Sequence, residues 1–352
     1  MKVGLTGFSR AGKTTLYNAL TGLSATVGGF EARHEAAMAV VKVPDPRVDA
    51  LSDIVHPKEK KYAEVTFLDF PPSQERKAAL EPQSVTQLRE VDALAQVVRA
   101  FDDPLANEPP APVRDLNAFQ AELILADLAI IEKRLERIRK EAVKAREREM
   151  ETDLLTRCQS TLEEERPLRS LEFLPEERTL LSGFAFLSVK PLLVVYNSDE
   201  VSLQQPLPAD VAEYAQAGNL TVVPVCGKLE MEIAQLDAGE RAEFLSELGL
   251  SETARDRFIR HAYDHLRLMS FFTAGPVEVR AWTVTRDTAA VNAAGKIHSD
   301  IERGFIRAEV ISYDDYIQHQ GESGCRSAGK LRLEGKEYRV QDGDVMHIRF
   351  NV

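Results

Sequence analysis

Residues 7–14 are the part of the chain whose types and spacing most directly predict chemistry. They read GFSRAGKT, which fits the pattern GxxxxGK followed by Ser or Thr. The two glycines let the backbone wrap with its N–H groups facing phosphate oxygens; Lys13 would reach the β- and γ-phosphates, and the Thr14 hydroxyl would ligate Mg²⁺. An apolar strand expected at 3–6 precedes the loop and a helix expected at 13–20 follows it, which is the context that a phosphate-binding loop requires.

An acidic residue at the end of a later strand supplies the second part of a metal site. Asp69 closes the apolar run 65–69, where P-loop proteins place the acid that holds Mg²⁺ through water. An acid also closes many strands for capping reasons alone, so this assignment depends on the loop upstream. With that loop present, we expect Thr14 and Asp69 to hold Mg²⁺ together with ATP or GTP.

A polar tetrapeptide follows the apolar run 192–196 and reads Asn197-Ser198-Asp199-Glu200. Guanine-specific proteins place Asn-Lys-x-Asp at this point, and their Asp accepts hydrogen bonds from guanine N1–H and the 2-amino group. Here Ser198 replaces the Lys, and the longer Glu200 replaces the Asp. Adenine has an acceptor at N1 and no 2-amino group, so the change favours ATP over GTP and leaves GTP open.

The elements that must position these residues alternate between strand and helix. A third apolar strand is expected at 95–101, and strands return at 191–196 and 220–225 after a helical region. This alternation predicts an α/β fold with a mostly parallel sheet and a ligand at the carboxyl ends of its strands.

The helical region, from 116 to about 171, has apolar residues at helical spacing. We expect a hairpin of two long helices. Its apolar positions are Leu128, Ile131, Leu135 and Ile138, followed by Leu154, Leu155, Cys158 and Leu162. The mixed charges from Lys133 to Arg148 suit a solvated face, with a partner-docking surface as the alternative.

A helical stretch ending near Leu268 leads into a last segment that predicts a separate α+β unit. The elements expected there are strands at 277–284, 305–311, 337–340 and 345–350, a helix at 291–303, and turns at 334–335 and 342–343.

Composition narrows the class of protein. The formal net charge of −12 over 352 residues argues against a protein that coats nucleic acid, so we expect no DNA partner. The cysteines Cys158, Cys226 and Cys325 have no spacing typical of zinc or of a disulfide framework. The N-terminus has no signal-peptide pattern and the apolar runs are too short to span a bilayer, so we expect a cytoplasmic protein and no membrane partner.

Short sequence motifs along the chain resemble those of one family. Pro44-Asp45-Pro46-Arg47 and Val222-Val223-Pro224-Val225-Cys226 lie in the first domain. The C-terminal words are FTAG at 272–275, EVRAWT at 278–283, AGKIH at 294–298, GFIRA at 304–308, DGDVM at 342–346 and FNV at 350–352. Together with the P-loop and the NxxE motif at 197–200, they are similar to the YchF family of Obg-like ATPases nearly end to end.

The resemblance implies a P-loop G domain, ATP preference, and association with the ribosome or a translation factor. The implied domains are 1–103 and 185–268 for the G domain, 104–184 for a helical insert, and 269–352 for a TGS domain of ubiquitin-like β-grasp fold. The residues expected to contact nucleotide are Gly7, Ser9, Arg10, Ala11, Gly12, Lys13, Thr14, Thr15, Asn197, Glu200, Cys226 and Gly227.

Three departures from the family pattern argue against efficient catalysis. The family's first switch carries a Thr that meets Mg²⁺ and the γ-phosphate, whereas no Ser or Thr occurs at 27–51, and Arg33-His34 occupies the approximate place. The second switch should read Asp-x-x-Gly, but Asp69 is followed by Phe70-Pro71-Pro72, and proline has no N–H to donate. The family's catalytic His is absent from the loop 102–113.

Arg10 stands where the family's loop has Asn. A guanidinium there could replace the monovalent ion that such an Asn helps to hold, act as an arginine finger in cis, or simply face solvent. Two functions fit a nucleotide site of this kind: ATP binding with weak or no hydrolysis, and an active ATPase or GTPase with a rearranged catalytic set that includes Arg10. Loss of the Thr, the Gly N–H and the His together favours the first. A third function, RNA binding by the C-terminal domain, lacks a basic excess at 270–352.

Overall fold

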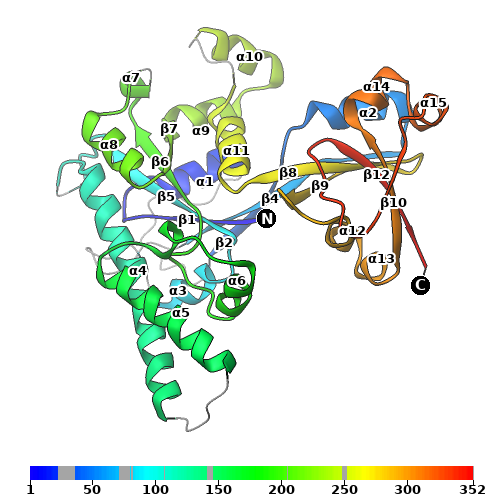
Figure 1. The fold of residues 1–352 in the computed structure, drawn as a ribbon. Helices are drawn as coiled ribbons and strands as arrows, with labels where there is room; N and C mark the ends of the chain where they lie inside the picture. Colours follow the sequence, from blue (N-terminus) through cyan, green and yellow to red (C-terminus); the bar gives the residue numbers. More distant parts are fainter. Residues whose placement is uncertain are drawn as a thin grey trace. The chain divides into compact units, whose positions relative to one another are not determined.

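The computed structural model describes residues 1–22, 36–70, 80, 82–106, 108–140, 146–203, 205–247 and 252–351. These residues form two compact units. The first unit comprises Lys2–Ala39 and Thr66–Phe258, and the second unit comprises Met1, Val40–Val65 and Ile259–Val352. Each unit is built around its own six-stranded sheet (Figure 1).

The sheet of the first unit has the order β2-β4-β1-β5-β6-β7. Its strands are β2 (Ala37–Lys42), β4 (Glu64–Asp69), β1 (Lys2–Thr6), β5 (Ala93–Ala100), β6 (Leu192–Ser198) and β7 (Thr221–Val225). The pairs from β4 to β7 are all parallel, and β5 and β6 are almost wholly buried because helices cover both faces. This arrangement confirms the α/β class, and the carboxyl ends of the five parallel strands meet at one edge.

Helices make up the rest of the first unit, and the last of them begins in this unit and ends in the second. They are α1 (Lys13–Thr21), α3 (Pro82–Leu88), α4 (Pro112–Lys140), α5 (Arg146–Glu163), α6 (Pro175–Ser182), α7 (Glu200–Leu203), α8 (Ala209–Ala217), α9 (Gly227–Gln235), α10 (Ala238–Glu247) and α11 (Ala254–His265). The two long helices expected in the middle of the chain are confirmed as α4 and α5, which pack against each other through a shared apolar cluster (Figure 1). Helix α4 begins earlier than expected, at Pro112, because proline suits the first turn of a helix.

A buried carboxylate joins helix α4 to the chain just before β6. Asp127 is fully buried and accepts hydrogen bonds from the backbone N–H groups of Leu187 and Ser188, at 2.9 and 2.7 Å. It also accepts from Arg89 Nη1 at 3.1 Å, and the same guanidinium donates to the carbonyl of Ala185. The charge of Asp127 is therefore balanced and its oxygens are satisfied, which fixes the base of the helical hairpin.

The sheet of the second unit has the order β11-β10-β12-β8-β9-β3. Its strands are β11 (Arg332–Glu334), β10 (Phe305–Ser312), β12 (Asp344–Phe350), β8 (Leu268–Ala274), β9 (Glu278–Thr285) and β3 (Glu59–Lys61). The first and last C-terminal strands, β8 and β12, pair in parallel at its centre. Helices α12 (Ala290–Ile297) and α13 (Ser299–Arg303) pack on one face, while α2 (Pro46–Val55), α14 (Tyr313–Gln318) and α15 (Glu322–Ser327) complete the unit.

Two expectations for the C-terminal segment were wrong. The helix expected at 291–303 is two helices, because His298 has an extended backbone with φ of −163° between them. The strand expected at 337–340 is not a strand. Arg339 makes a single bridge to Ala289, and Val340 N–H donates to the carbonyl of Thr288 in the loop before α12.

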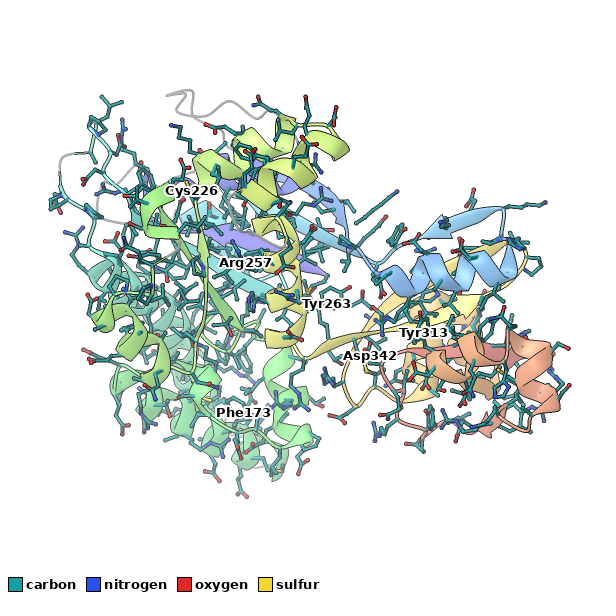
Figure 2. The ribbon with its side chains drawn as sticks, turned by 90° about the horizontal axis from the view of Figure 1, so that it is seen from above. Phe173, Cys226, Arg257, Tyr263, Tyr313 and Asp342 are labelled. Atoms are coloured by element: carbon teal, nitrogen blue, oxygen red, sulfur yellow. The ribbon has the colours of Figure 1, made fainter. Side chains whose placement is uncertain are left out.

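Residues 40–65 belong to the second unit, whereas the expected boundaries put them in the first domain. Helix α2 is fastened there by Arg47, whose guanidinium donates to Asp45 and, at 2.9 Å, to Asp342 (labelled in Figure 2), and lies 4.9 Å from the ring centre of Phe272. Strand β3 extends the sheet by pairing in parallel with β9. Within the described residues, no helix combines the length and the apolar character that crossing a bilayer requires.

Candidate functional site

The loop after β1 has a backbone that only glycine allows at two positions. Gly7 has φ of 130° and Gly12 has φ of 89°, both outside the range that side chains favour. A Cβ at Gly7 would lie 2.3 Å from the carbonyl oxygen of Val97, and a Cβ at Gly12 would lie 2.2 Å from Asn197 Nδ2. The loop is therefore packed between β5 and the end of β6, and α1 begins directly after it.

Lys13 is buried at the centre of this loop. Its Nζ donates to the carbonyl oxygens of Gly7, at 2.6 Å, and Phe8, at 2.9 Å. Burial lowers the pKa of Lys13 to about 8, and the nearby carboxylate of Asp69 opposes that shift only in part. An ammonium held among neutral acceptors would gain from an anion at the same place.

Thr14 and Asp69 meet where a metal ion would be expected. Thr14 Oγ1 donates to Asp69 Oδ2 at 3.1 Å, and the carboxylate is buried at the end of β4. A hydroxyl and a single carboxylate form an oxygen donor set that suits Mg²⁺, which takes its other ligands from water and from phosphates. Among the described residues there is no group of three or more His, Cys, Asp or Glu side chains that could hold a metal by itself. The pair fits a magnesium ion that arrives with a nucleotide.

Asn197, which we expect to contact the base, connects two backbone segments in this structure. Its buried amide donates to the carbonyl of Ala11 at 2.9 Å and accepts from the N–H of Gly227 at 3.0 Å. It therefore joins the phosphate loop to the first residue of α9. A Cβ at Gly227 would lie 3.5 Å from Thr15 Cγ2, so α1 and α9 also approach closely at this point.

The remaining expected base-site residues lie along the same edge of the sheet. Cys226, labelled in Figure 2, is buried after β7, and burial above all raises the pKa of its thiol, with Glu200 and Asp199 adding to the rise. Glu200 is exposed at the first position of α7, directly after β6. Ser9, in the phosphate loop, is also exposed.

Arg10 forms an ion pair that no pattern in the sequence indicates. It has φ of 63°, a left-handed backbone, and its Nη1 lies 2.9 Å from Oδ2 of Asp103 in the loop after β5. The other oxygen, Oδ1, accepts from the N–H of Leu105 at 3.0 Å. These donors lower the pKa of Asp103, the Leu105 N–H first and Arg10 second. Asp103 can be noticed in the sequence as an acid that follows a buried strand. The spacing of the sequence gives no sign that it pairs with Arg10.

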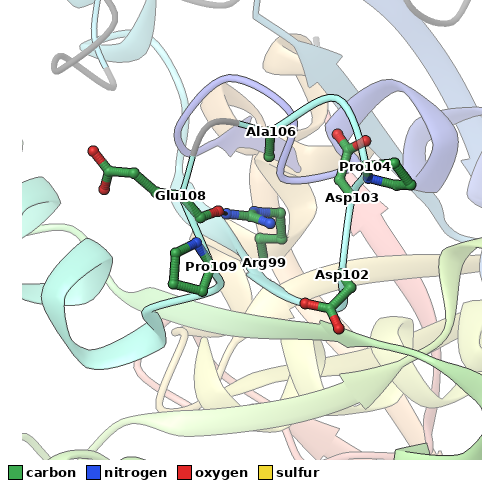
Figure 3. A pocket seen from close by; sticks show the side chains of 7 residues that line it. All are labelled: Arg99, Asp102, Asp103, Pro104, Ala106, Glu108 and Pro109. Carbon is green, nitrogen blue, oxygen red and sulfur yellow. Dashed lines mark hydrogen bonds between the residues drawn. The ribbon is translucent and has the colours of Figure 1, made fainter.

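The loop that carries Asp103 surrounds a hollow of about 330 Å³ (Figure 3). Arg99, on β5, holds both ends of this loop. Its Nη2 donates to the carbonyl of Glu108 at 2.6 Å, and its Nη1 donates to that of Phe101 at 3.3 Å. The lining residues are Arg99, Asp102, Asp103, Pro104, Ala106, Glu108 and Pro109. Three of them are acidic, so the hollow itself does not suit phosphate.

The departures expected in the two switches lie outside the described residues. Arg33 and His34 fall within 23–35, and Pro71 and Pro72 fall within 71–79. Their expected effects on γ-phosphate contacts therefore remain predictions from the sequence.

Comparison with known proteins identifies the family over the whole chain. A protein of Bacillus subtilis named ribosome-binding ATPase YchF is 39% identical over 364 residues and covers 100% of both chains. The protein of the same name from Haemophilus influenzae is 41% identical over 365 residues, covering 100% of this chain and 99% of its own. This chain belongs to the YchF family. The family model YchF-GTPase_C, described as a protein of unknown function (DUF933), matches residues 268–351.

A solved structure supports the family assignment at the level of the fold. The Schizosaccharomyces pombe YchF GTPase is 28% identical, with a TM-score of 0.86, and the match covers 99% of this chain and 97% of that one. The arrangement described above is therefore the YchF architecture.

Proposed function

We propose that the chain binds ATP with Mg²⁺ at the loop 7–14 and hydrolyses it weakly or not at all. The observation that carries the proposal is the loop itself, where Lys13 is buried among carbonyl oxygens and Thr14 lies 3.1 Å from Asp69. The relatives named ribosome-binding ATPase YchF support it. GTP remains the second nucleotide, since Glu200 is exposed at the start of α7 and its carboxylate can accept hydrogen bonds from guanine.

The proposed contacts divide by the part of the nucleotide that they meet. Phosphate contacts come from Gly7, Ser9, Arg10, Ala11, Gly12, Lys13, Thr14 and Thr15, base contacts from Asn197, Glu200, Cys226 and Gly227, and Mg²⁺ contacts from Thr14 and Asp69. Since Asn197 already braces the loop, we expect it to orient the base site and the phosphate site together.

The alternative function is an active ATPase or GTPase in which Arg10 stabilises charge on the phosphates. Its support is the position of Arg10 inside the loop, where an arginine can act in cis. The missing Thr, Gly N–H and His argue against a fast enzyme. Phosphate release by the purified protein separates the two functions.

The deciding test of nucleotide binding is calorimetry with ATP and Mg²⁺. Lys13→Ala should abolish binding, because the β- and γ-phosphate charge would then be uncompensated in the loop. Lys133→Ala is the matched control, since Lys133 is exposed on α4. Equal affinity in both variants would refute the site.

The proposed partner is the ribosome or a translation factor, contacted through the helical hairpin and the C-terminal domain in the cytoplasm. The domains proposed along the sequence are a G domain (1–103 and 185–268), a helical insert (104–184) and a TGS domain (269–352). Within the G domain so defined, segments 40–65 and 259–268 lie in the second compact unit. The order β9-β8-β12-β10-β11, with β8 and β12 parallel at the centre, supports a β-grasp fold for the last. Sedimentation of the full chain with ribosomes, in ATP and in ADP, tests the partner.

A further inference from the structure

The phosphate loop carries two cations, and the structure gives them different partners. Lys13 is buried and bonded to carbonyl oxygens of its own loop. Arg10 reaches out of the loop to Asp103, and 39% of its side chain is exposed against 17% for Asp103. Because Arg10 lies in the same loop that would wrap the phosphates, its guanidinium has two anionic partners to choose between once a nucleotide binds.

The two partners differ in strength and in mobility. A half-exposed ion pair contributes little, because water screens it and ordering the side chains costs entropy. A guanidinium on phosphate forms stronger, charge-assisted and often bidentate hydrogen bonds. Asp103 is also the fixed member of the pair, since Leu105 N–H holds its second oxygen and Arg99 anchors the loop around it. Arg10 is the member that can move.

We propose that Asp103 is a positioning residue that holds Arg10 at rest and releases it to the phosphates of a bound nucleotide. The proposal rests on the proposed function, because it needs phosphate at the loop. The free energy needed to break the Arg10–Asp103 ion pair reduces the affinity for nucleotide. Asp103 therefore sets how readily the loop accepts a polyphosphate, although it touches none itself.

Calorimetry with ATP and Mg²⁺ tests this exchange on the wild type, Asp103→Asn, Arg10→Gln and the double variant, with Asp102→Asn and Asp103→Glu as controls. Asp103→Asn keeps an oxygen for the Leu105 N–H but removes the charge, so it should tighten binding about two- to fivefold. Arg10→Gln should weaken binding about tenfold. In the Arg10→Gln background, Asp103→Asn should change affinity no more than Asp102→Asn does in the wild type, since Asp102 is a neighbouring exposed acid.

Under the proposed exchange, Asp103→Glu keeps the charge and should have the wild-type affinity. If Asp103 were only structural, its variants would lose stability instead, and thermal unfolding checks that all variants are folded. If Asp103→Asn raised the affinity for ATP equally in the wild type and in Arg10→Gln, the gain would come only from removing a negative charge near the phosphates. That result would overturn the exchange. A loss of affinity in Asp103→Asn would show that the pair persists in the complex, which also overturns it. If the wild type binds no nucleotide, the proposed function fails first and this proposal fails with it.

Discussion

Lys13 and Arg10 are cations of one loop, yet their surroundings give them different electrostatic behaviour. Lys13 has exchanged water for two carbonyl oxygens, and burial brings its pKa to about 8. Arg10 instead lies in a half-exposed ion pair with Asp103. Because the pKa of Lys13 is lowered to about 8, phosphate binding should show a pH dependence that belongs to Lys13.

Nucleotide binding should take up a proton above about pH 8. In the free protein the pKa of Lys13 is lowered to about 8, so the amine becomes neutral as pH rises through that value. Bound phosphate favours the ammonium and raises that pKa again, so the bound state holds more protons. Affinity should be level below about pH 8 and fall above it, by at most about tenfold per pH unit.

Calorimetry in two buffers of different ionisation enthalpy measures that uptake directly. At about pH 8.5 the two buffers should give different binding heats, whereas at about pH 7 they should nearly agree because Lys13 is then protonated in both states. Identical heats at the higher pH would show that Lys13 stays charged in the free protein.

Gly12→Ala should abolish nucleotide binding and cost stability. The new Cβ would lie 2.2 Å from Asn197 Nδ2 and would hold a φ of 89°, a strain of about 1–3 kcal/mol. Gly22→Ala is the matched control, because Gly22 has φ of 70° and nothing within 4 Å of its Cβ. Urea unfolding and calorimetry should show a small loss of stability and intact binding for Gly22→Ala. Intact binding by Gly12→Ala would mean that Asn197 does not brace the loop.

At the scale of elements, strands with continuous apolar runs and helices with long periodic stripes could be predicted. Strands β1, β4, β5 and β6 and helices α4 and α5 were expected near their observed bounds. Strand β3 could not be predicted from the sequence. Its residues Glu59-Lys60-Lys61 are exposed and form a strand only by pairing with β9. The strand expected at 337–340 is wrong for the same reason, because alternation along the sequence does not show that pairing there is a single bridge between Arg339 and Ala289.

The same limit applies to the site. Gly7, Lys13 and Thr14 follow from spacing, because a phosphate loop is local in sequence. Asp103 pairs with Arg10 across 93 residues, and Asn197 braces Ala11 across 186. Neither contact leaves a periodic or local signal, so only the folded chain reveals it.

The hairpin's attachment should depend on Asp127. Asp127→Ala would leave the N–H groups of Leu187 and Ser188 and the charge of Arg89 without their acceptor. Removing one partner of a buried ion pair costs about 3–5 kcal/mol. Asp153→Ala, an exposed position on α5, should stay within about 0.5 kcal/mol of the wild type. Urea unfolding compares them, and equal midpoints would contradict the buried network.

At the scale of the whole molecule, the chain between β2 and β4 passes through the second unit. Strand β2 leaves the first sheet, residues 40–65 form α2 and β3 in the second unit, and β4 returns to end at Asp69. Arg47 fastens this excursion through Asp45 and Asp342. The family match at 268–351 therefore covers only part of the unit that its residues build.

We expect the protein to respond little to the difference between ATP and ADP. In an intact switch, the γ-phosphate draws two loops together through a Thr on one and a Gly N–H on the other. Residues 27–51 have no Ser or Thr, and Pro72 cannot donate. A ligand shifts an equilibrium only by its differential affinity for the two states. ATP and ADP should therefore bind within about tenfold of each other, or about 1.4 kcal/mol.

Hydrogen exchange at 28–40 and 71–83, with ADP and with a non-hydrolysable ATP analogue, tests this directly. Little difference between the two is expected, because no side chain in 27–51 supplies the hydroxyl that would sense the third phosphate. The Arg10→Gln variant is the control, since Arg10 and Arg33 are the cations able to take over that contact. Strong extra protection with the analogue, lost in Arg10→Gln, would show that the guanidinium released by Asp103 reaches the γ-phosphate. An arginine at that position stabilises the charge that develops during phosphoryl transfer, so the active ATPase would then replace the weakly hydrolysing protein proposed above.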